Sequence, residues 1–461
     1  MKLRWLAFGI GLVVSLWLVW RGQLGGDQLN LLARGWLLVN DGEWIAYGNP
    51  MSTGGHTPGG VTSLLIGLPL FLWLDPRAPS LLVFLFHLAG WFVLERGLRG
   101  LLSEHERLWL VACYWLSPWR LFFSGFLWNP NYLFFFGALH LWACRVQRDR
   151  PRFWPSFALA GGLVLALQIH PSALLLLAAC GLLWLRRYFQ PHWLGGIAGA
   201  LVAGSTLIPW FLTLASQPTI VTEVERGFPF RGLVLVYPLL RGLSYWFRYP
   251  TPFLPEKVTR FDFSTALGGE DVWLGPLVTK LAQWLLPLTL VVALGATVWL
   301  LRRWHRRRWW APLPATASGR RWLHGYLVWC WIAGVGVYAL APTTPRYWQG
   351  VCLFHAAVLT LVMWIGVFGR SRLRRRIPVA VFAWTLLGLG LAVAVGLGSP
   401  QYRCGGRGDL RFPLASHSPM FDELGIQRSC PWPLDQPGTW WPDVLPRGEP
   451  VAISPKVAGV P

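Results

Sequence analysis

The chain has 461 residues, of which 54% are hydrophobic and 32 are tryptophan, and its mean hydropathy is +0.43. This composition excludes an ordinary soluble domain, and hydrophobic runs of roughly 15 to 22 residues recur from end to end, as transmembrane helices require. The formal net charge of +21 does not indicate a nucleic-acid partner, because most basic residues stand in short clusters between hydrophobic runs, where they orient a chain in the membrane and face anionic headgroups. The sequence has no P-loop, no dinucleotide-binding Gly-x-Gly-x-x-Gly and no Cys-x-x-Cys pair, which argues against a nucleotide-dependent reaction.

The basic clusters predict the topology. Residues 5–20 lead straight into polar residues with no small-residue cleavage site, so we expect an uncleaved first helix. Under the positive-inside rule all six clusters are cytoplasmic, and an even number of spans separates neighbouring clusters. Residues 61–74 are apolar but short for a span, and a crossing there would turn every later cluster outward, so we interpret them as a juxtamembrane helix on the outer face. The clusters are Lys2/Arg4, Arg96/Arg99/Arg107, Arg145/Arg148/Arg150/Arg152, Arg186/Arg187, Arg302 to Arg308 with Arg320/Arg321, and Arg370 to Arg376.

The pattern predicts an all-α polytopic membrane protein of about eleven transmembrane helices, with the N-terminus inside and the C-terminus outside. Residues 1–397 would form one transmembrane domain, whose outer face carries a first loop, 21–80, and a large loop, 215–280. The predicted spans are 5–20, 81–95, 108–125, 131–144, 153–169, 171–185, 193–214, 281–301, 322–341, 350–368 and 377–397.

The last segment, residues 398–461, is rich in Pro and Gly and is predicted to be an outer, loop-rich tail. Cys404 and Cys430 would then share an oxidising compartment, so we predict a disulfide between them. The other five cysteines lie in or at the ends of predicted spans and are interpreted as packing residues.

The first outer loop holds the leading candidate for chemistry, Asp27. It follows the first span closely, and a charged residue at membrane depth usually has a function. Residues 28–39 carry apolar side chains at helical spacing, which predicts an amphipathic helix on the bilayer surface that fixes Asp27 nearby. Asp41 and Glu43 are competing carboxylates in a turn-like segment, and we interpret them as solvated or supporting groups.

The segment Gly48 to Gly60 consists of residues typical of turns. Within it His56 is a candidate general base, metal ligand or hydrogen-bond donor, and Tyr47 just before it is a candidate substrate-binding residue. Asn129 and His170, each followed by proline, are predicted at outer turns, where converging span ends would line one cavity.

Cations mixed with aromatic residues mark two further outer segments. Arg346 and Tyr347 stand at the outer start of a predicted span, and Arg241 and Arg248 lie in the large loop. Arginine binds phosphate in a bidentate manner but also anchors helices at the membrane edge, so both interpretations stay open.

These pieces, in this order, resemble the GT-C membrane glycosyltransferases, specifically the protein-mannosyltransferase and aminoarabinose-transferase-like group. The resemblance covers the chain to roughly residue 370. It rests on a first helix, an early acidic residue in the first outer loop, a leucine-rich juxtamembrane helix, and a series of short motifs. The motifs are His56-Thr57-Pro58, Ser117-Pro118, Asn129-Pro130, His170-Pro171 and Arg346-Tyr347.

The resemblance implies transfer of a sugar from a polyprenyl-phosphate donor to a glycan, lipid or protein acceptor on the outer face, among membrane lipids. By position Asp27 would be the catalytic base, and Arg346, with Arg241 or Arg248, would stabilise the leaving phosphate. The sequence departs from the family pattern, since Gln28 stands where a second acidic residue is common and Thr57 separates His56 from proline. Because Gln28 replaces a second carboxylate, we assign no metal ligands, and the question of a divalent metal cofactor is left open.

Two other classes of function remain open. A secondary transporter would have internal repeats, broken helices and ionisable groups near the middle of the membrane. A lipid-linked glycan polymerase or ligase would share the phosphate-binding chemistry. Trp- and Arg-rich usage favours a bacterial inner membrane, with the active site on the periplasmic face.

Overall fold

The computed structural model describes residues 2–20, 26–51, 55–75, 77–216, 236–251, 274–306, 317–341, 345–368, 383 and 385–390. The predicted disulfide Cys404–Cys430, the tail 398–461 and most of the predicted span 377–397 lie outside these residues, as do residues 217–235 and 252–273 of the large outer loop.

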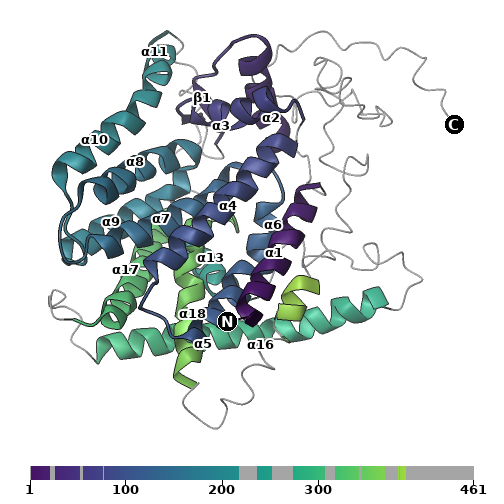
Figure 1. Ribbon diagram of the computed structural model, residues 1–461, viewed down its shortest axis with the longest axis vertical. Helices are drawn as coiled ribbons and strands as arrows, with labels where there is room; N and C mark the ends of the chain where they lie inside the picture. Colours follow the sequence, from purple (N-terminus) through teal and green to yellow (C-terminus); the bar gives the residue numbers. More distant parts are fainter. Residues whose placement is uncertain are drawn as a thin grey trace.

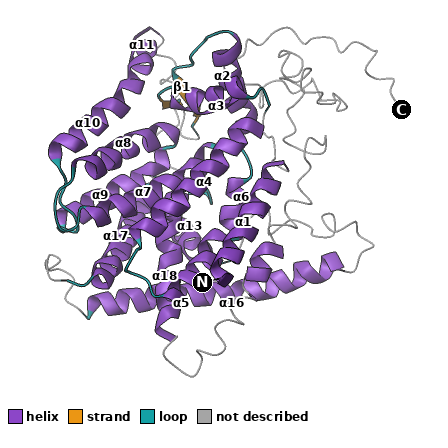
Figure 2. Cartoon of the chain, in the orientation of Figure 1, coloured by secondary structure: helices purple, strands orange, loops and turns teal. Residues whose placement is uncertain are grey.

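The described residues are mostly helical (Figures 1 and 2). Short 3-10 or π turns, η1 to η4 and η6, join several of the helices. A two-stranded antiparallel sheet, β1 (Tyr47–Pro50) with β2 (His56–Pro58), is the other regular element in these residues. The α-helices are α1 (Lys2–Trp20), α2 (Gly26–Asn40), α3 (Val61–Leu72), α4 (Arg77–Gly97), α5 (Glu104–Leu110), α6 (Pro118–Ser124), α7 (Leu133–Val146), α8 (Phe153–Ile169), α9 (Leu174–Leu185), α10 (Trp193–Gly204), α11 (Ile208–Ser216), α13 (Val236–Arg248), α16 (Leu274–His305), α17 (Gly319–Ala339) and α18 (Phe354–Phe368).

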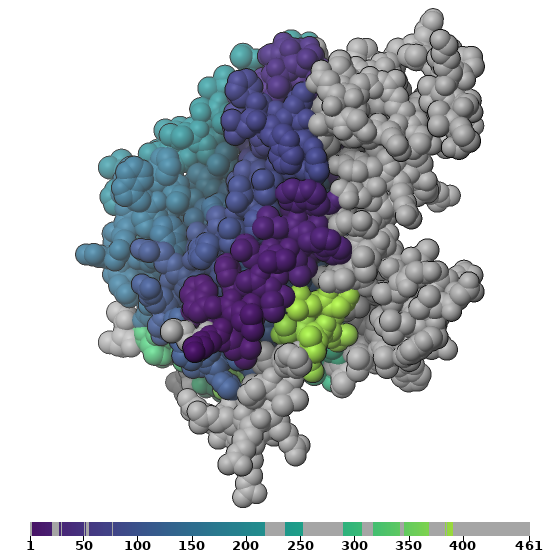
Figure 3. Space-filling model, turned by 45° about the vertical axis from the view of Figure 1, so that its right-hand side comes forward, coloured from purple at the N-terminus to yellow at the C-terminus, as the bar shows by residue number. Residues whose placement is uncertain are grey.

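Three helical stretches among the described residues are long and apolar enough to cross a membrane. They are Lys2–Trp20, Arg77–Gly97 and the run Trp193–Ser216 that joins α10 to α11. In Figure 3 the first of them, α1, lies on the outside of the molecule, where it exposes large apolar side chains such as Leu6 and Val13. These features fit a helical membrane protein, and the full set of eleven crossings stays a prediction.

The predicted juxtamembrane helix forms as α3. Its 12 residues rise about 18 Å, well short of a hydrocarbon core about 30 Å thick. α3 packs against α2, and the contact is close because a side chain at Gly35 would meet Ile66. The predicted amphipathic helix also forms, as α2, but Leu31 and Leu32 are fully buried inside the protein. Packing of α2 on α3 therefore holds Asp27 in place.

Two sequence expectations about local structure are wrong. The segment Gly48 to Gly60 contains the β1–β2 hairpin instead of turns alone, with Thr57 Oγ1 donating to the Asn49 carbonyl oxygen at 3.2 Å. The predicted span 108–125 is interrupted: α5 passes into a π turn, η1 (Val111–Trp115), and α6 starts afresh at Pro118. Proline has no N–H to continue the preceding helix, so the chain breaks there.

The predicted break at His170-Pro171 is confirmed. His170 adopts an extended backbone (φ −158°, ψ 131°), because the proline ring disfavours a helical conformation in the residue before it. α8 therefore ends at Ile169, and a 3-10 turn, η3 (Pro171–Ala173), leads into α9. This break places a polar side chain between two apolar helices.

Candidate functional site

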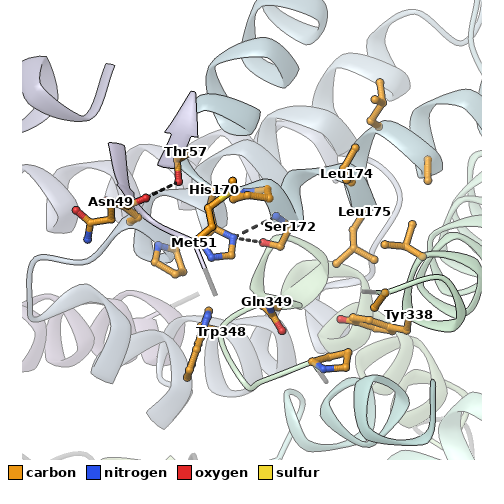
Figure 4. A pocket seen from close by; sticks show the side chains of 18 of the residues that line it. Asn49, Met51, Thr57, His170, Ser172, Leu174, Leu175, Tyr338, Trp348 and Gln349 are labelled. Atoms are coloured by element: carbon orange, nitrogen blue, oxygen red, sulfur yellow. Dashed lines mark hydrogen bonds between the residues drawn. The ribbon is translucent and has the colours of Figure 1, made fainter. Parts of the chain in front are cut away.

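A cavity of about 810 Å³ lies where several helix ends and turns meet. Figure 4 shows it from close by. Its volume is in the range of small-molecule sites, about 300 to 1,000 Å³. The described residues that line it are Asp27, Asn49, Met51, Thr57, Trp128, Asn129, Pro130, His170, Pro171, Ser172, Leu174, Leu175, Leu177, Ala178, Val337, Tyr338, Leu340, Ala341, Pro345, Trp348 and Gln349.

The cavity brings together three of the predicted site residues. Asp27 comes from the first turn of α2, Asn129 from the 3-10 turn η2 (Asn129–Tyr132), and His170 from the break between α8 and η3. The expectation that distant span ends would line one cavity is thus met for these residues. Arg120, Asn131, Tyr47, His56, Arg241, Arg248, Arg346 and Tyr347 are not among the lining residues.

Asp27 is held from two sides. Trp128 Nε1 donates to Asp27 Oδ2 at 2.9 Å, and Asn49 Nδ2 donates to the Asp27 carbonyl oxygen at 3.3 Å. The carboxylate lies in the first turn of α2, where the helix dipole favours a negative charge. One carboxylate oxygen is therefore engaged by an indole N–H while the residue borders the cavity.

The β1–β2 hairpin presents neighbouring residues of β2 to opposite sides, and the register of β1 shifts between Tyr47 and Pro50. Asn49 and Thr57 line the cavity and are buried, whereas Tyr47 and His56 lie outside its lining. The Tyr47 and His56 rings meet edge to face, 4.7 Å between centroids, and the buried Arg34 donates to the Tyr47 carbonyl oxygen at 2.8 Å. Because successive side chains of a strand point to opposite faces, Thr57, not His56, is the member of the His56-Thr57-Pro58 motif that lines the cavity.

His170 has a defined hydrogen-bonding state. Its Nδ1 accepts from the backbone N–H of Ser172 at 3.1 Å and lies 2.8 Å from the Ser172 hydroxyl. A backbone N–H needs an acceptor, so Nδ1 carries a lone pair and the neutral ring has its hydrogen on Nε2. Burial lowers the pKa of His170 to about 4, which keeps the ring neutral at physiological pH.

The turn that precedes η6 (Val351–Leu353) reaches the cavity through Pro345, Trp348 and Gln349. Arg346 itself is exposed, with its guanidinium carbon 5.6 Å from the centre of a Trp348 ring. Tyr347 packs on Trp128 at 6.1 Å between ring centroids, behind the cavity wall. Arg346 is thus at the rim of the site and not in its lining.

The two arginines of the large loop lie on α13. Arg248 is buried, its guanidinium carbon 5.1 Å from the Tyr245 ring, and Arg241 lies 5.9 Å from the same ring. Next to them Tyr249 donates its hydroxyl to the Tyr347 carbonyl oxygen at 2.8 Å, and burial raises the pKa of Tyr249. These aromatic and cationic side chains of α13 lie behind the turn that carries Gln349 and support it.

Arg120 is a separate buried polar residue. It is fully enclosed on α6, where its Nε donates to the Trp115 carbonyl oxygen at 2.8 Å and its guanidinium lies 3.8 Å from the centre of a Trp115 ring. Asn131 is equally buried and donates to the Phe126 carbonyl oxygen at 2.6 Å. Both residues pack in the core and do not line the cavity.

The cavity has two chemically different ends. Asn49 and Thr57 line one end, which is polar, and Asp27 lies beside Asn49, whose Nδ2 donates to the Asp27 carbonyl oxygen. Leucines of α9 line the other end, which is apolar, with Val337, Tyr338, Leu340 and Ala341. Among the described lining residues Asp27 is the one carboxylate, and no group of three His, Cys, Asp or Glu side chains that could hold a metal occurs in the described part of the chain. The lining therefore suits a ligand with a polar head and an apolar tail.

Four functional candidates were not predicted: Trp128, Asn49, Ser172 and Gln349. Trp128 directly precedes Asn129-Pro130 and Ser172 follows His170-Pro171, so the proline motifs pointed to the right neighbourhood. Asn49 precedes Pro50, the same signal in the first outer loop. Nothing in the sequence distinguishes Gln349.

Comparison of the chain with protein-family models, curated proteins and solved structures finds no match. The cavity and its residues are therefore the basis for assigning a function.

Proposed function

We propose that the protein is a glycosyltransferase that moves a sugar from a polyprenyl-phosphate donor to a lipid, glycan or protein acceptor. The observation that supports this most directly is the amphipathic cavity, in which Asp27 shares one continuous space with the leucines of α9 and the end of α17. A lipid-linked sugar has the same division, with a polar sugar phosphate and an apolar chain. With the positive-inside topology, the cavity would open on the outer, periplasmic face of a bacterial inner membrane.

Asp27 is the proposed general base. Its Oδ1 would take the proton of an acceptor hydroxyl as that oxygen attacks the anomeric carbon, while the bond from that carbon to the phosphate oxygen breaks and the phosphate leaves with the electron pair. The hydrogen bond from the Trp128 indole N–H to Oδ2 supports this assignment, in which Oδ2 is held in place and Oδ1 accepts the proton. Direct displacement of this kind inverts the anomeric centre, and base assistance contributes on the order of 10²–10⁴ in rate.

The apolar end supports binding of the lipid. Leu174 and Leu177 of α9 are exposed yet line the cavity, so that wall continues to the surface of the protein. A polyprenyl chain placed there could reach the surrounding bilayer without leaving apolar surroundings. Arg346 at the rim would draw the anionic headgroup toward the site, with the cations of the large outer loop.

The test uses the purified full chain with a set of polyprenyl-phosphate sugars, and mass spectrometry of the products. Asp27→Asn should keep the thermal midpoint of the wild type but lose transfer by about 10²–10⁴-fold. Asp41→Asn is the matched control, because Asp41 is an exposed carboxylate just past the other end of α2, bonded to Asn40 Nδ2 at 2.6 Å. Full transfer by Asp27→Asn would remove Asp27 from the role of base.

One observation favours a secondary transporter as the second candidate. The helical segment 104–124 is broken by the π turn and encloses the buried cation Arg120, and transporters place such features at midplane sites. Solute uptake by proteoliposomes that is lost in Arg120→Met and kept in Asp27→Asn would favour transport. Sugar transfer that is lost in Asp27→Asn and kept in Arg120→Met would favour the glycosyltransferase.

A further inference from the structure

The boundary between the two ends of the cavity is formed by neutral hydrogen-bond donors. Figure 4 shows His170, Ser172 and Gln349 between Asn49 and Thr57 on one side and Leu174 and Leu175 on the other. In an amphipathic ligand the atoms at such a boundary are those that join the polar head to the apolar tail. In a lipid-linked sugar this junction is the phosphate.

His170 can only donate to a ligand. Its Nδ1 lone pair is taken by the Ser172 backbone N–H at 3.1 Å, so Nε2 carries the hydrogen. Among the described residues no partner binds Nε2, and the side chain lines the cavity. This excludes His170 as a base and leaves a single N–H for an acceptor oxygen.

A hydrogen bond to the backbone also fixes the orientation of the Gln349 amide. Its Oε1 accepts from the Arg346 backbone N–H at 2.6 Å, and a backbone N–H requires the oxygen of the amide rather than its nitrogen. The two hydrogens of Nε2 are then directed away from that bond, on a side chain that lines the cavity. The amide therefore also offers donors to a ligand.

We propose that His170 Nε2–H and the Gln349 amide N–H groups form a neutral donor pair that binds the phosphate oxygens of a polyprenyl-phosphate lipid. The pair deepens the proposed function and rests on it for the identity of the lipid. Neutral donors can stabilise the charge of a leaving phosphate without forming a tight ion pair with Asp27 in the same cavity. Asp27 and the phosphate would face the sugar from different sides.

Two substitutions at His170 test the roles of its two ring nitrogens separately. Asparagine places an acceptor near the position of Nδ1, so His170→Asn keeps the bond to the Ser172 N–H and loses the donor at the position of Nε2. Glutamine places an amide near the position of Nε2, so His170→Gln keeps the donor and loses the bond to Ser172. Gln349→Glu keeps the acceptor for the Arg346 N–H and replaces the donors with a carboxylate. His192→Asn is the matched control, because His192 caps α10 through Nδ1 and the Gly195 N–H at 3.1 Å, outside the cavity lining.

The measurement is the affinity of the purified full chain in detergent for three probes: a polyprenyl monophosphate, the corresponding polyprenol and inorganic phosphate. We expect the wild type to prefer the monophosphate, and His170→Asn and Gln349→Glu each to weaken its binding on the order of 10-fold or more, as loss of a bond to a charged group predicts. Binding of polyprenol should not change. His170→Gln should bind the monophosphate within about threefold of the wild type but unfold at a lower temperature, because a cap is lost.

Three results with the monophosphate and polyprenol probes would overturn the proposal. They are equal affinity of His170→Asn and wild type for the monophosphate, loss of affinity in His170→Gln as large as in His170→Asn, and polyprenol bound as tightly as its phosphate. Tight binding of inorganic phosphate alone would show a free anion site and would also reject the lipid. None of these measurements needs sugar transfer, so the donor pair and the role of Asp27 can fail independently.

Discussion

Trp128→Phe should impair catalysis more than substrate binding. The substitution keeps an aromatic ring in the group formed by Trp128 and Trp348, whose centroids are 5.0 Å apart, and removes the second ring of the indole with the N–H that donates to Asp27 Oδ2 at 2.9 Å. Asp27 would keep its place in α2 and the bond from Asn49 to its backbone. What it would lose is the fixed rotation of its carboxylate about the side chain.

The size of the effect follows from that one bond. A hydrogen bond to a charged acceptor contributes about 1.5–3 kcal/mol, which corresponds to roughly 10- to 150-fold in a rate if the bond acts mainly in the transition state. Part of this is recovered, because water can enter the space of the missing N–H. We therefore expect kcat to fall about 10-fold, with KM for the lipid donor changed less than twofold.

The assay is steady-state transfer by the purified protein, with Trp322→Phe as the control. Trp322 is fully buried and also donates its indole N–H, to the Tyr188 carbonyl oxygen at 2.8 Å, but it does not line the cavity. The control measures the cost of losing an indole bond in general. If Trp128→Phe and Trp322→Phe have the same kcat, Trp128 does not position the base.

Two further predictions concern stability. Gly199→Ala should lower the free energy of unfolding by about 2 kcal/mol, because the added methyl group would meet the Phe157 backbone. The control is Gly196→Ala, one turn away, which should be neutral or stabilising because the nearest atom to the added methyl group, on Ala160, is 4.0 Å away. Equal thermal midpoints of the two variants would contradict the close packing of α10 on α8. The lowered pKa of His170, about 4 against the usual 6.5, means that the folded protein binds fewer protons than the unfolded chain between these values. Thermal midpoints in detergent should therefore fall as pH drops from 6.5 toward 4, and less steeply for His170→Asn; equal slopes would show that another group dominates.

The sequence was a good guide to where apolar helices lie. Residues 153–169 were predicted as one helix and form α8 with the same bounds, and the short apolar segment 61–74 forms α3, Val61–Leu72. Both follow from the length of apolar runs and from proline and glycine at their ends. Hydropathy does not detect an interruption inside an apolar run, which is why the break between residues 111 and 118 was missed.

The candidate site was predicted in part, and the misses have a common cause. Asp27 and His170 were found because polar residues at helix ends are unusual in such a chain. His56 was chosen over Thr57 because histidine has the richer chemistry, but strand alternation decides which of two neighbours lines the cavity. Arg346 was chosen for its charge, whereas the turn around it directs Trp348 and Gln349 to the cavity instead. Side-chain direction depends on backbone pairing that a single sequence does not show.

Proline follows several of the polar residues that line the cavity. Four of its polar lining residues stand directly before a proline: Asn49, Thr57, Asn129 and His170. The proline ring disfavours the helical conformation in the preceding residue. Accordingly Asn49 and Thr57 lie in the β1–β2 hairpin, Asn129 is the first residue of the turn η2, and His170 ends α8. A helix end in an apolar protein leaves backbone groups without helical partners, and a polar side chain beside them can bind those groups, as His170 does for Ser172. His170 therefore has two roles: its Nδ1 binds a backbone N–H that the broken helix leaves without a partner, and its ring lines the cavity, where it can meet a polar ligand.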